Sequence, residues 1–157
     1  ISLAIALTEA GWFSRARIEI HAGDASEAAL KRARAGRFGA RAFRQLSDTL
    51  RARYFNHDAA SGEWTVSQAI HTRVTSWRSL NVVRQSELEA VRGANVIFCR
   101  NMFIYFQPST ILQVVDGFAD LMSSPAFLCV GAAESLLRVT ARFDLQDLAG
   151  AYVYVKA

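Results

Sequence analysis

The stretch VIFCRNMFIYFQP, residues 96–108, decides the fold of this chain. Its first four residues are apolar without alternation, which is typical of a strand buried on both faces in a parallel sheet. The run ends at Arg100-Asn101, where two polar side chains follow the strand directly. Because ligands of open α/β sheets bind beyond the carboxyl ends of the strands, this guanidinium and this carboxamide predict a binding site, which Tyr105 joins one turn later. A helix after Pro108 then completes a strand–loop–helix unit.

Toward the N-terminus, the spacing of apolar residues predicts short helices and strands. An alternating strand at residues 17–23 ends at Asp24, and Ser26 caps a helix that runs through Ala35 to a break at Gly36. A carboxylate at the tip of such a strand is suited to accept the hydroxyl protons of a ribose, but a lone Asp before a helix is also a common loop or capping residue. The other elements expected there are a helix within residues 1–13 that stops at Gly11, two short helices within residues 41–55 interrupted near Ser47, a Ser61-Gly62 turn, and strands at residues 63–67 and 73–80.

Toward the C-terminus, the pattern predicts one long helix and three strands. A short helix-like connection at residues 87–93 leads into the opening strand, and Ser123-Ser124-Pro125 ends the helix that begins at Pro108. An all-apolar strand follows at residues 126–131, and a closing antiparallel pair at residues 143–145 and 152–155 surrounds Gly150. The face of the long helix expected to pack against the sheet consists of Ile111, Leu112, Val115, Phe118, Ala119 and Met122.

Length and composition bound the possibilities. A chain of 157 residues with 52% hydrophobic and 20% charged residues predicts one globular domain with a sizeable core. No apolar run approaches the roughly 18 residues that a membrane helix needs, and the first residues lack a basic leader and a cleavage site, so nothing argues for export. Cys99 and Cys129 lie in apolar runs and form no metal motif. We expect buried free thiols, no metal, and a cytoplasmic protein.

The net charge of +4 is unevenly distributed. A solvated helix face is the simplest interpretation of its basic segment, and contact with an acidic protein surface is the alternative. Nucleic acid is less favoured, because no aromatic platform or groove-reading motif accompanies the charges. Against the single acid Asp48, the segment from residue 31 to residue 53 contains eight basic residues: Lys31, Arg32, Arg34, Arg37, Arg41, Arg44, Arg51 and Arg53.

Several segments resemble one known family. CRNMFIYF, residues 99–106, resembles the CRNV(L/M)IYF signature of the chemotaxis receptor methyltransferases, the CheR family. GDASEAALKRARAG, residues 23–36, resembles the family's TDI(S/D)xxALxxARxG, and Leu80-Asn81-Val82 resembles its LNL. GAAESL, residues 131–136, resembles GHSESL with the His and the Ser replaced by alanine, and Ser123-Ser124-Pro125 stands where the family has Pro-Gly-Gly. The match runs in register from Ser2 to the C-terminus.

The resemblance implies an α/β fold, the Rossmann-like sheet of class I methyltransferases, with a small antiparallel β subdomain at about residues 61–80. Residues 1–157 would form part of an S-adenosylmethionine-dependent domain, without the N-terminal helical domain. In the family, a GxxxGEE loop precedes a helix that reads YSLA, whose end matches Ser2-Leu3-Ala4. The glycine loop and the first strand, which lies between the second and fourth strands of the family's sheet, are therefore expected upstream. We expect a gap in the sheet of these residues and poor cofactor binding and doubtful activity when they are alone.

The implied reaction is methyl transfer from S-adenosylmethionine to glutamate side chains on the cytoplasmic helices of chemoreceptors, with S-adenosylhomocysteine as the product. Carried over from the family, Arg100 would hold the incoming carboxylate and Tyr105 would lie beside the methyl group. A glutamate is already ionised at neutral pH, with a pKa of about 4.3, so no general base is needed. The structural alternatives, which we favour less, are a structural ion pair for Arg100 and a packed aromatic role for Tyr105.

Cofactor-binding residues are implied at three places. Asn81 taken alone would be a turn former rather than a neighbour of the adenine. A degenerate, non-catalytic protein-binding module is the alternative function, which Ala132-Ala133 favours. The implied cofactor contacts are Asp24 and Ala25 at the ribose, Asn81 and Val82 near the adenine, and Asn101 and Met102 at the methionine part of the cofactor.

Overall fold

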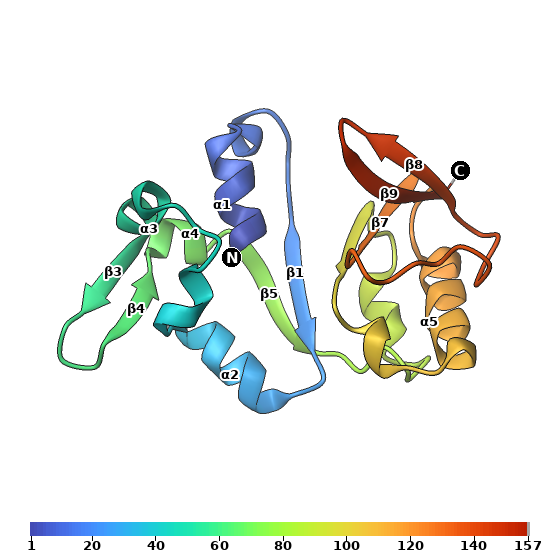
Figure 1. Cartoon of the computed structure of the whole chain (residues 1–157), viewed down its shortest axis with the longest axis horizontal. Helices are drawn as coiled ribbons and strands as arrows, with labels where there is room; N and C mark the ends of the chain where they lie inside the picture. Colours follow the sequence, from blue (N-terminus) through green and yellow to red (C-terminus); the bar gives the residue numbers. More distant parts are fainter. Residues whose placement is uncertain (157) are drawn as a thin grey trace. The chain divides into compact units, whose positions relative to one another are not determined.

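The computed structural model describes residues 1–156. The chain divides into two compact units, the first over Ile1–Ser79 and the second beginning at Leu80 (Figure 1). Both units combine helices with β-strands, so the predicted α/β class is confirmed.

A parallel pair of strands forms the centre of the first unit. β1 (Ile20–Asp24) pairs with β5 (Val74–Ser79), and α2 (Glu27–Ala35) contacts both strands. The predicted ends of α2 are confirmed: the Ser26 hydroxyl accepts a hydrogen bond from the N–H of Ala29 at 3.2 Å, and Gly36 takes the left-handed conformation with φ +64°. These local signals are sufficient because each acts within one turn of the helix end.

The small antiparallel sheet differs from the predicted one. It consists of β2 (Arg37–Phe38), β4 (Glu63–Val66) and β3 (Phe55–Asp58), with β4 in the middle. We expected residues 73–80 to join it, but β5 instead pairs with β1. The helix α4 (Gln68–His71) separates β4 from β5, and the long connection from β1 to β5 is what a parallel pair requires.

Short helices and a local core complete the first unit. α1 (Ser2–Glu9) ends before Gly11, which has φ +69°, and η1 (Trp12–Ser14) follows. η2 (Ala40–Phe43) and α3 (Asp48–Tyr54) are the predicted pair interrupted near Ser47, whose hydroxyl caps α3. The buried residues of this core are Ala4, Ile5, Phe43, Phe55, Val66 and Ile70.

The second unit contains a mixed four-stranded sheet. β6 (Val96–Cys99) and β7 (Ala126–Val130) run parallel, and β9 (Ala151–Lys156) then pairs antiparallel with both β7 and β8 (Asp144–Leu148). The strand order is β6-β7-β9-β8. The predicted strand after Pro125 and the predicted closing pair around Gly150 are both confirmed.

One long helix covers the core of the second unit. α5 (Pro108–Leu121) follows the short turn η4 (Phe103–Tyr105) and contacts η3 (Leu88–Val91). Its buried face is shifted from the predicted one, because Leu112 is 39% exposed whereas Val114 and Leu121 are buried. The core otherwise contains Leu88, Cys99, Phe103, Val115, Phe118, Ala119, Met122, Ala126, Leu128, Leu136, Phe143 and Tyr154.

The burial expected for the opening strand is wrong. In β6, Val96 is 46% and Phe98 is 54% exposed, whereas Cys99 is buried and Ile97 packs against the core. Neighbouring residues of a strand point to opposite faces, so β6 has one covered and one open face.

Among the described residues, the strands β1 and β6 have one pairing partner each. Within residues 1–156, β6 pairs with β7 alone and β1 pairs with β5 alone. The two strands that were expected to flank the gap therefore belong to separate sheets.

No helix among the described residues combines the length and the apolar character needed to cross a bilayer.

Replacing Phe118 by alanine should lower the free energy of unfolding by about 3–5 kcal/mol, because the ring is 1% exposed and its loss leaves a cavity. The matched control on the same helix is Leu112→Ala, which should cost about 1 kcal/mol or less because this side chain is 39% exposed. Urea unfolding followed by circular dichroism measures both. Equal losses would contradict the burial of this face of α5.

Candidate functional site

The loop after β6 carries four of the predicted site residues. Arg100 is exposed and forms no ion pair with any residue in the described part of the chain, and the Tyr105 side chain is 79% exposed. Within the described residues, neither an ion pair of Arg100 nor close packing of Tyr105 is present. Asn101 has φ +57°, an uncommon conformation for a residue other than glycine, and Met102 packs partly against the core.

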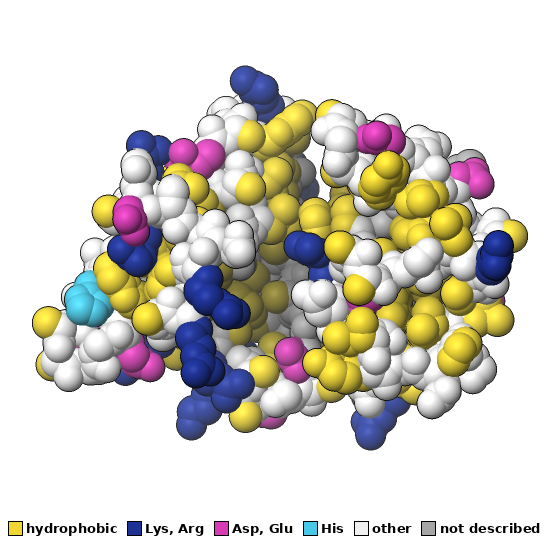
Figure 2. Space-filling model, viewed as in Figure 1, with side chains coloured by type: hydrophobic (Ala, Val, Ile, Leu, Met, Phe, Trp, Pro, Cys, Tyr) yellow, Lys and Arg dark blue, Asp and Glu magenta, His cyan; other side chains and the backbone are white. Residues whose placement is uncertain are grey.

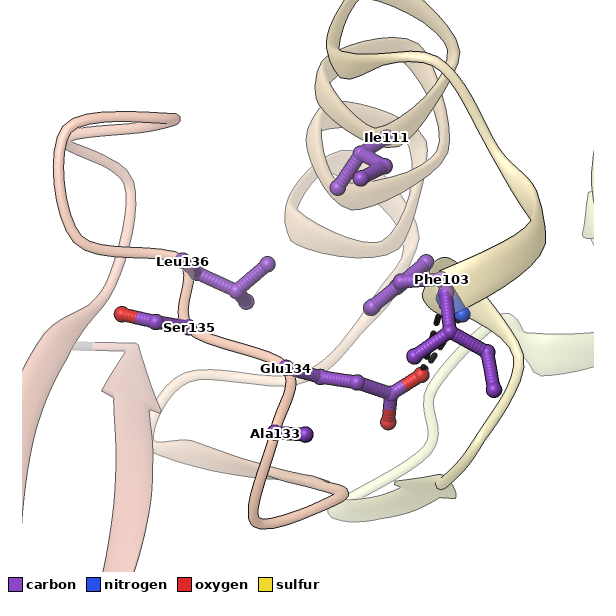
Figure 3. Close-up of a pocket in the computed structure, with 7 residues that line it drawn as sticks. Phe103, Ile111, Ala133, Glu134, Ser135 and Leu136 are labelled. Carbon is purple, nitrogen blue, oxygen red and sulfur yellow. Dashed lines mark hydrogen bonds between the residues drawn. The ribbon is translucent and has the colours of Figure 1, made fainter.

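A buried carboxylate holds this loop. The Glu134 side chain is 6% exposed, and its Oε2 accepts hydrogen bonds from the N–H groups of Asn101 at 2.7 Å and Gly131 at 2.6 Å. Its Oε1 accepts from the N–H of Phe103 at 2.7 Å and, at 3.4 Å, from that of Ile104. Figure 3 shows the side chain reaching from the segment after β7 to the turn at Phe103.

The electrostatics of Glu134 favour its ionised form. Burial alone would raise the pKa of this carboxyl, but the hydrogen bonds from the N–H groups of Gly131, Asn101 and Phe103 outweigh burial and hold the pKa below its usual value. The GAAESL segment was matched to its family motif, but sequence reasoning assigned Glu134 no role. The sequence did contain one signal for such a role. Glu134 is a single carboxylate between a buried strand and the apolar Leu136, and a carboxylate that is buried there needs hydrogen-bond partners.

A small cavity lies beside this carboxylate. Its volume of about 120 Å³ is well below the roughly 300 Å³ at which ligand pockets usually begin, so this cavity alone does not accommodate a nucleoside. Ala133, which stands at the position of the family's Ser, lines it with a methyl group. Its full lining, shown in Figure 3, consists of Phe103, Ile104, Ile111, Ala133, Glu134, Ser135 and Leu136.

Asp24 and Ala25 belong to the first unit and lie at the carboxyl end of β1. The Asp24 Oδ1 accepts a hydrogen bond from the N–H of Ser26 at 2.8 Å, which is the loop role that a lone Asp before a helix commonly has. Its Oδ2 has no hydrogen-bond donor within residues 1–156, and Ala25 is exposed. An exposed carboxylate with one oxygen free of donors in the described part of the chain fits the hydroxyl groups of a ribose.

Asn81 and Val82 follow β5 and belong to the second unit. The Asn81 Oδ1 accepts from the N–H of Val83 at 3.2 Å, so the turn-forming role is present, and its own N–H donates to Glu87 at 2.7 Å. Its carboxamide nitrogen has no acceptor among the described residues, and Val82 packs partly against the core. This free amide fits a polar edge of an adenine. Asp24 and Ala25 lie in the first unit and the other predicted site residues lie in the second, so a site shared by all of them stays a prediction.

The thiols of both cysteines have raised pKa values. Burial and the charge of Glu134 raise the pKa of the Cys99 thiol to about 12, so almost none of it is a thiolate at neutral pH. Burial also raises the pKa of Cys129, against the opposing effect of Arg100. Residues 1–156 contain no group of three His, Cys, Asp or Glu side chains placed to hold a metal ion.

Iodoacetamide at pH 8 should leave Cys99 unmodified in the folded protein and alkylate it rapidly in 6 M guanidinium chloride, because only the thiolate reacts. Cys129, which is half-buried, should react at an intermediate rate. Mass spectrometry of tryptic peptides after timed quenching gives both rates. Rapid native labelling of Cys99 would contradict its burial.

Half of the basic residues of the segment from residue 31 to residue 53 are paired with acids of the first unit. Four of its eight basic residues form ion pairs there, and Arg51 also lies 4.9 Å from the centre of the Trp64 ring. Figure 2 shows Lys and Arg side chains gathered around α2 and η2. These contacts favour a solvated face with internal pairing. The pairs are Arg34–Glu27, Arg37–Glu63, Arg51–Asp48 and Arg53–Glu9.

A family model for the SAM-binding domain of CheR methyltransferases matches residues 1–151. The chain belongs to this family. Its sheets and helices are those of a class I methyltransferase-like fold.

Curated relatives agree with this assignment. "Chemotaxis protein methyltransferase 2" of Vibrio cholerae is 28% identical over 88% of this chain and 48% of the relative. A "Chemotaxis protein methyltransferase" of Vibrio parahaemolyticus is 31% identical over 82% of this chain and 46% of the relative. A "Probable biofilm formation methyltransferase" of Pseudomonas aeruginosa is 30% identical over 87% of this chain and 31% of the relative. The chain thus spans about half the length of the first two relatives, and less of the third.

Proposed function

We propose that the protein containing this chain transfers a methyl group from S-adenosylmethionine to glutamate side chains on the cytoplasmic helices of chemoreceptors and forms glutamyl methyl esters. The observation that supports this most directly is the loop after β6, where Arg100 and Tyr105 are exposed on a backbone tied to the buried Glu134. The names of the relatives support a role in chemotaxis. The biofilm-related methyltransferase among them leaves the identity of the receptor open.

The residues of this chain would bind and orient the reactants. S-adenosylmethionine, when bound, supplies a methyl group activated by a positively charged sulfur. Asp24 with Ala25 would contact its ribose, Asn81 with Val82 its adenine, and Asn101 with Met102 its methionine part.

Arg100 would hold the acceptor carboxylate by charge-assisted hydrogen bonds, and Tyr105 would lie beside the methyl group. A carboxylate oxygen forms the new bond to the methyl carbon while the carbon–sulfur bond breaks and its electron pair stays on sulfur, giving S-adenosylhomocysteine. The acceptor is already ionised at neutral pH, so no proton needs to be removed. Alignment of donor and acceptor is then the main contribution of the protein, and it is worth about 7–11 kcal/mol in well-oriented systems.

The non-catalytic alternative is less favoured. A module that had lost its reaction would have no reason to keep Arg100 and Tyr105 exposed beside a costly buried carboxylate. The alanines at positions 132 and 133 remove two polar groups, but the Glu134 contacts to the loop are intact.

In the full-length gene product, Arg100→Ala should lower kcat/KM for receptor methylation by about 10–100-fold, because charge-assisted hydrogen bonds contribute about 1.5–3 kcal/mol each. Tyr105→Phe should also lower the rate. The measurement is transfer of a labelled methyl group from S-adenosylmethionine to receptor-containing membranes, followed by base-labile release that identifies an ester.

The matched control is Arg92→Ala, which removes a surface arginine whose ion-pair partner in the described residues is Glu89 and should leave the rate unchanged. Full activity in Arg100→Ala would refute the assigned role of this residue. Absence of transfer by the unmutated protein, with receptors from its own organism, would favour the binding module.

A further inference from the structure

Glu134 is the only polar or charged side chain in the buried class within the described residues. No cation neutralises it there, since none of the ion pairs found in residues 1–156 includes Glu134. Backbone N–H groups are instead its partners: Gly131 and Asn101 on one oxygen, and Phe103 and Ile104 on the other. Burying a charge costs free energy. We therefore expect the backbone geometry that Glu134 holds to have a function.

The carboxylate connects the ends of two parallel strands. Cys99 of β6 is paired with Val130 of β7, and the chain leaves both strands at the next residue, Arg100 and Gly131. Glu134 bridges these two exits, and through Asn101 it contacts a residue in the left-handed conformation. The left-handed conformation is unfavourable for a residue other than glycine. The hydrogen bond from the Asn101 N–H to Glu134 stabilises this conformation.

The directions of Arg100 and Tyr105 therefore depend on the backbone. Both side chains are exposed, and neither forms a side-chain hydrogen bond or ion pair among the described residues. Arg100 directly precedes the first N–H that Glu134 binds in the loop, and Tyr105 directly follows the last.

We infer that Glu134 is a positioning residue for methyl transfer, which aims Arg100 and Tyr105 by fixing the backbone between them. This inference rests on the proposed function. It assigns to Glu134 no contact with the substrate or the cofactor. A displacement of about 1 Å at a reacting group can cost roughly 100-fold in rate, so the backbone contact is sufficient to control the reaction.

Glu134→Gln in the full-length gene product tests this directly. The amide is almost isosteric, but its NH₂ group faces backbone N–H donors where an oxygen accepted them. We expect kcat to fall about 10–100-fold with the KM for S-adenosylmethionine within about threefold. The matched control is Glu89→Gln, which removes a surface carboxylate paired with Arg92 and should change neither parameter.

A double-mutant cycle separates positioning from a general structural effect. Because Glu134 is inferred to aim both Arg100 and Tyr105, the losses from Glu134→Gln and Tyr105→Phe should be less than multiplicative when the two changes are combined. Fully multiplicative losses would overturn the inference. Gly131→Ala is the second variant, because its Cβ would lie 2.6 Å from the Glu134 Oε2 and 2.8 Å from the Asn101 Oδ1 and so displaces the carboxylate without removing its charge. If Glu134→Gln does not fold, this variant should reproduce the loss of kcat, and unchanged kcat would overturn the inference.

Amide hydrogen exchange tests the backbone role of Glu134 without relying on the proposed reaction. The N–H groups of Asn101, Phe103 and Gly131 should be protected in the unmutated protein and should exchange at least tenfold faster in Glu134→Gln or Gly131→Ala, while amides of α5 stay protected. If the unmutated protein transfers no methyl group, the proposed function fails, but accelerated exchange at these three amides still supports the backbone role. Unchanged exchange there in a folded variant overturns the inference, whatever the activity.

Discussion

A carboxylate that is buried without a cation imposes the strongest constraint on the second unit. The ionised Glu134 has to be surrounded by hydrogen-bond donors, and the backbone N–H groups of two loops supply them. Those N–H groups depend equally on the carboxylate, because buried donors without an acceptor are costly. The exits of β6 and β7 are therefore coupled, and neither loop can rearrange without leaving polar groups of the other unpaired.

Polar side chains in this protein fall into two groups that differ in their partners. Arg51 and Arg53, within the basic segment, are held by carboxylates of their own unit. Arg100 and Tyr105 lie at the end of a strand with their polar groups directed to solvent and without such partners in the described residues. The polar groups of Arg100 and Tyr105 are therefore available to bind a substrate, whereas an arginine in an internal ion pair already has a partner.

Burial was the property that local patterns predicted least well. The run at residues 96–99 has the composition of a strand covered on both faces, yet Val96 and Phe98 are about half exposed. The composition of a strand indicates the environment to which the strand is suited. The elements that cover its two faces belong to other parts of the chain or lie outside the chain. Local patterns also failed to predict one strand pairing. The strand at residues 74–79 is the next strand after β4, but its partner is β1.

The sequence by itself determined the features that act over a few residues, together with the family. Ser26, Ser47 and Gly36 define helix ends through contacts within one turn, and the segments at residues 23–36 and 99–106 identify a CheR methyltransferase domain. Only the tertiary structure decided the pairing of β5 with β1 and the hydrogen bonds of Glu134. The carboxylate lies 33 residues from Asn101 and 31 from Phe103 in the chain, so no local pattern could show that they meet. Hydrogen bonds of that kind form only when the fold brings two strand ends together.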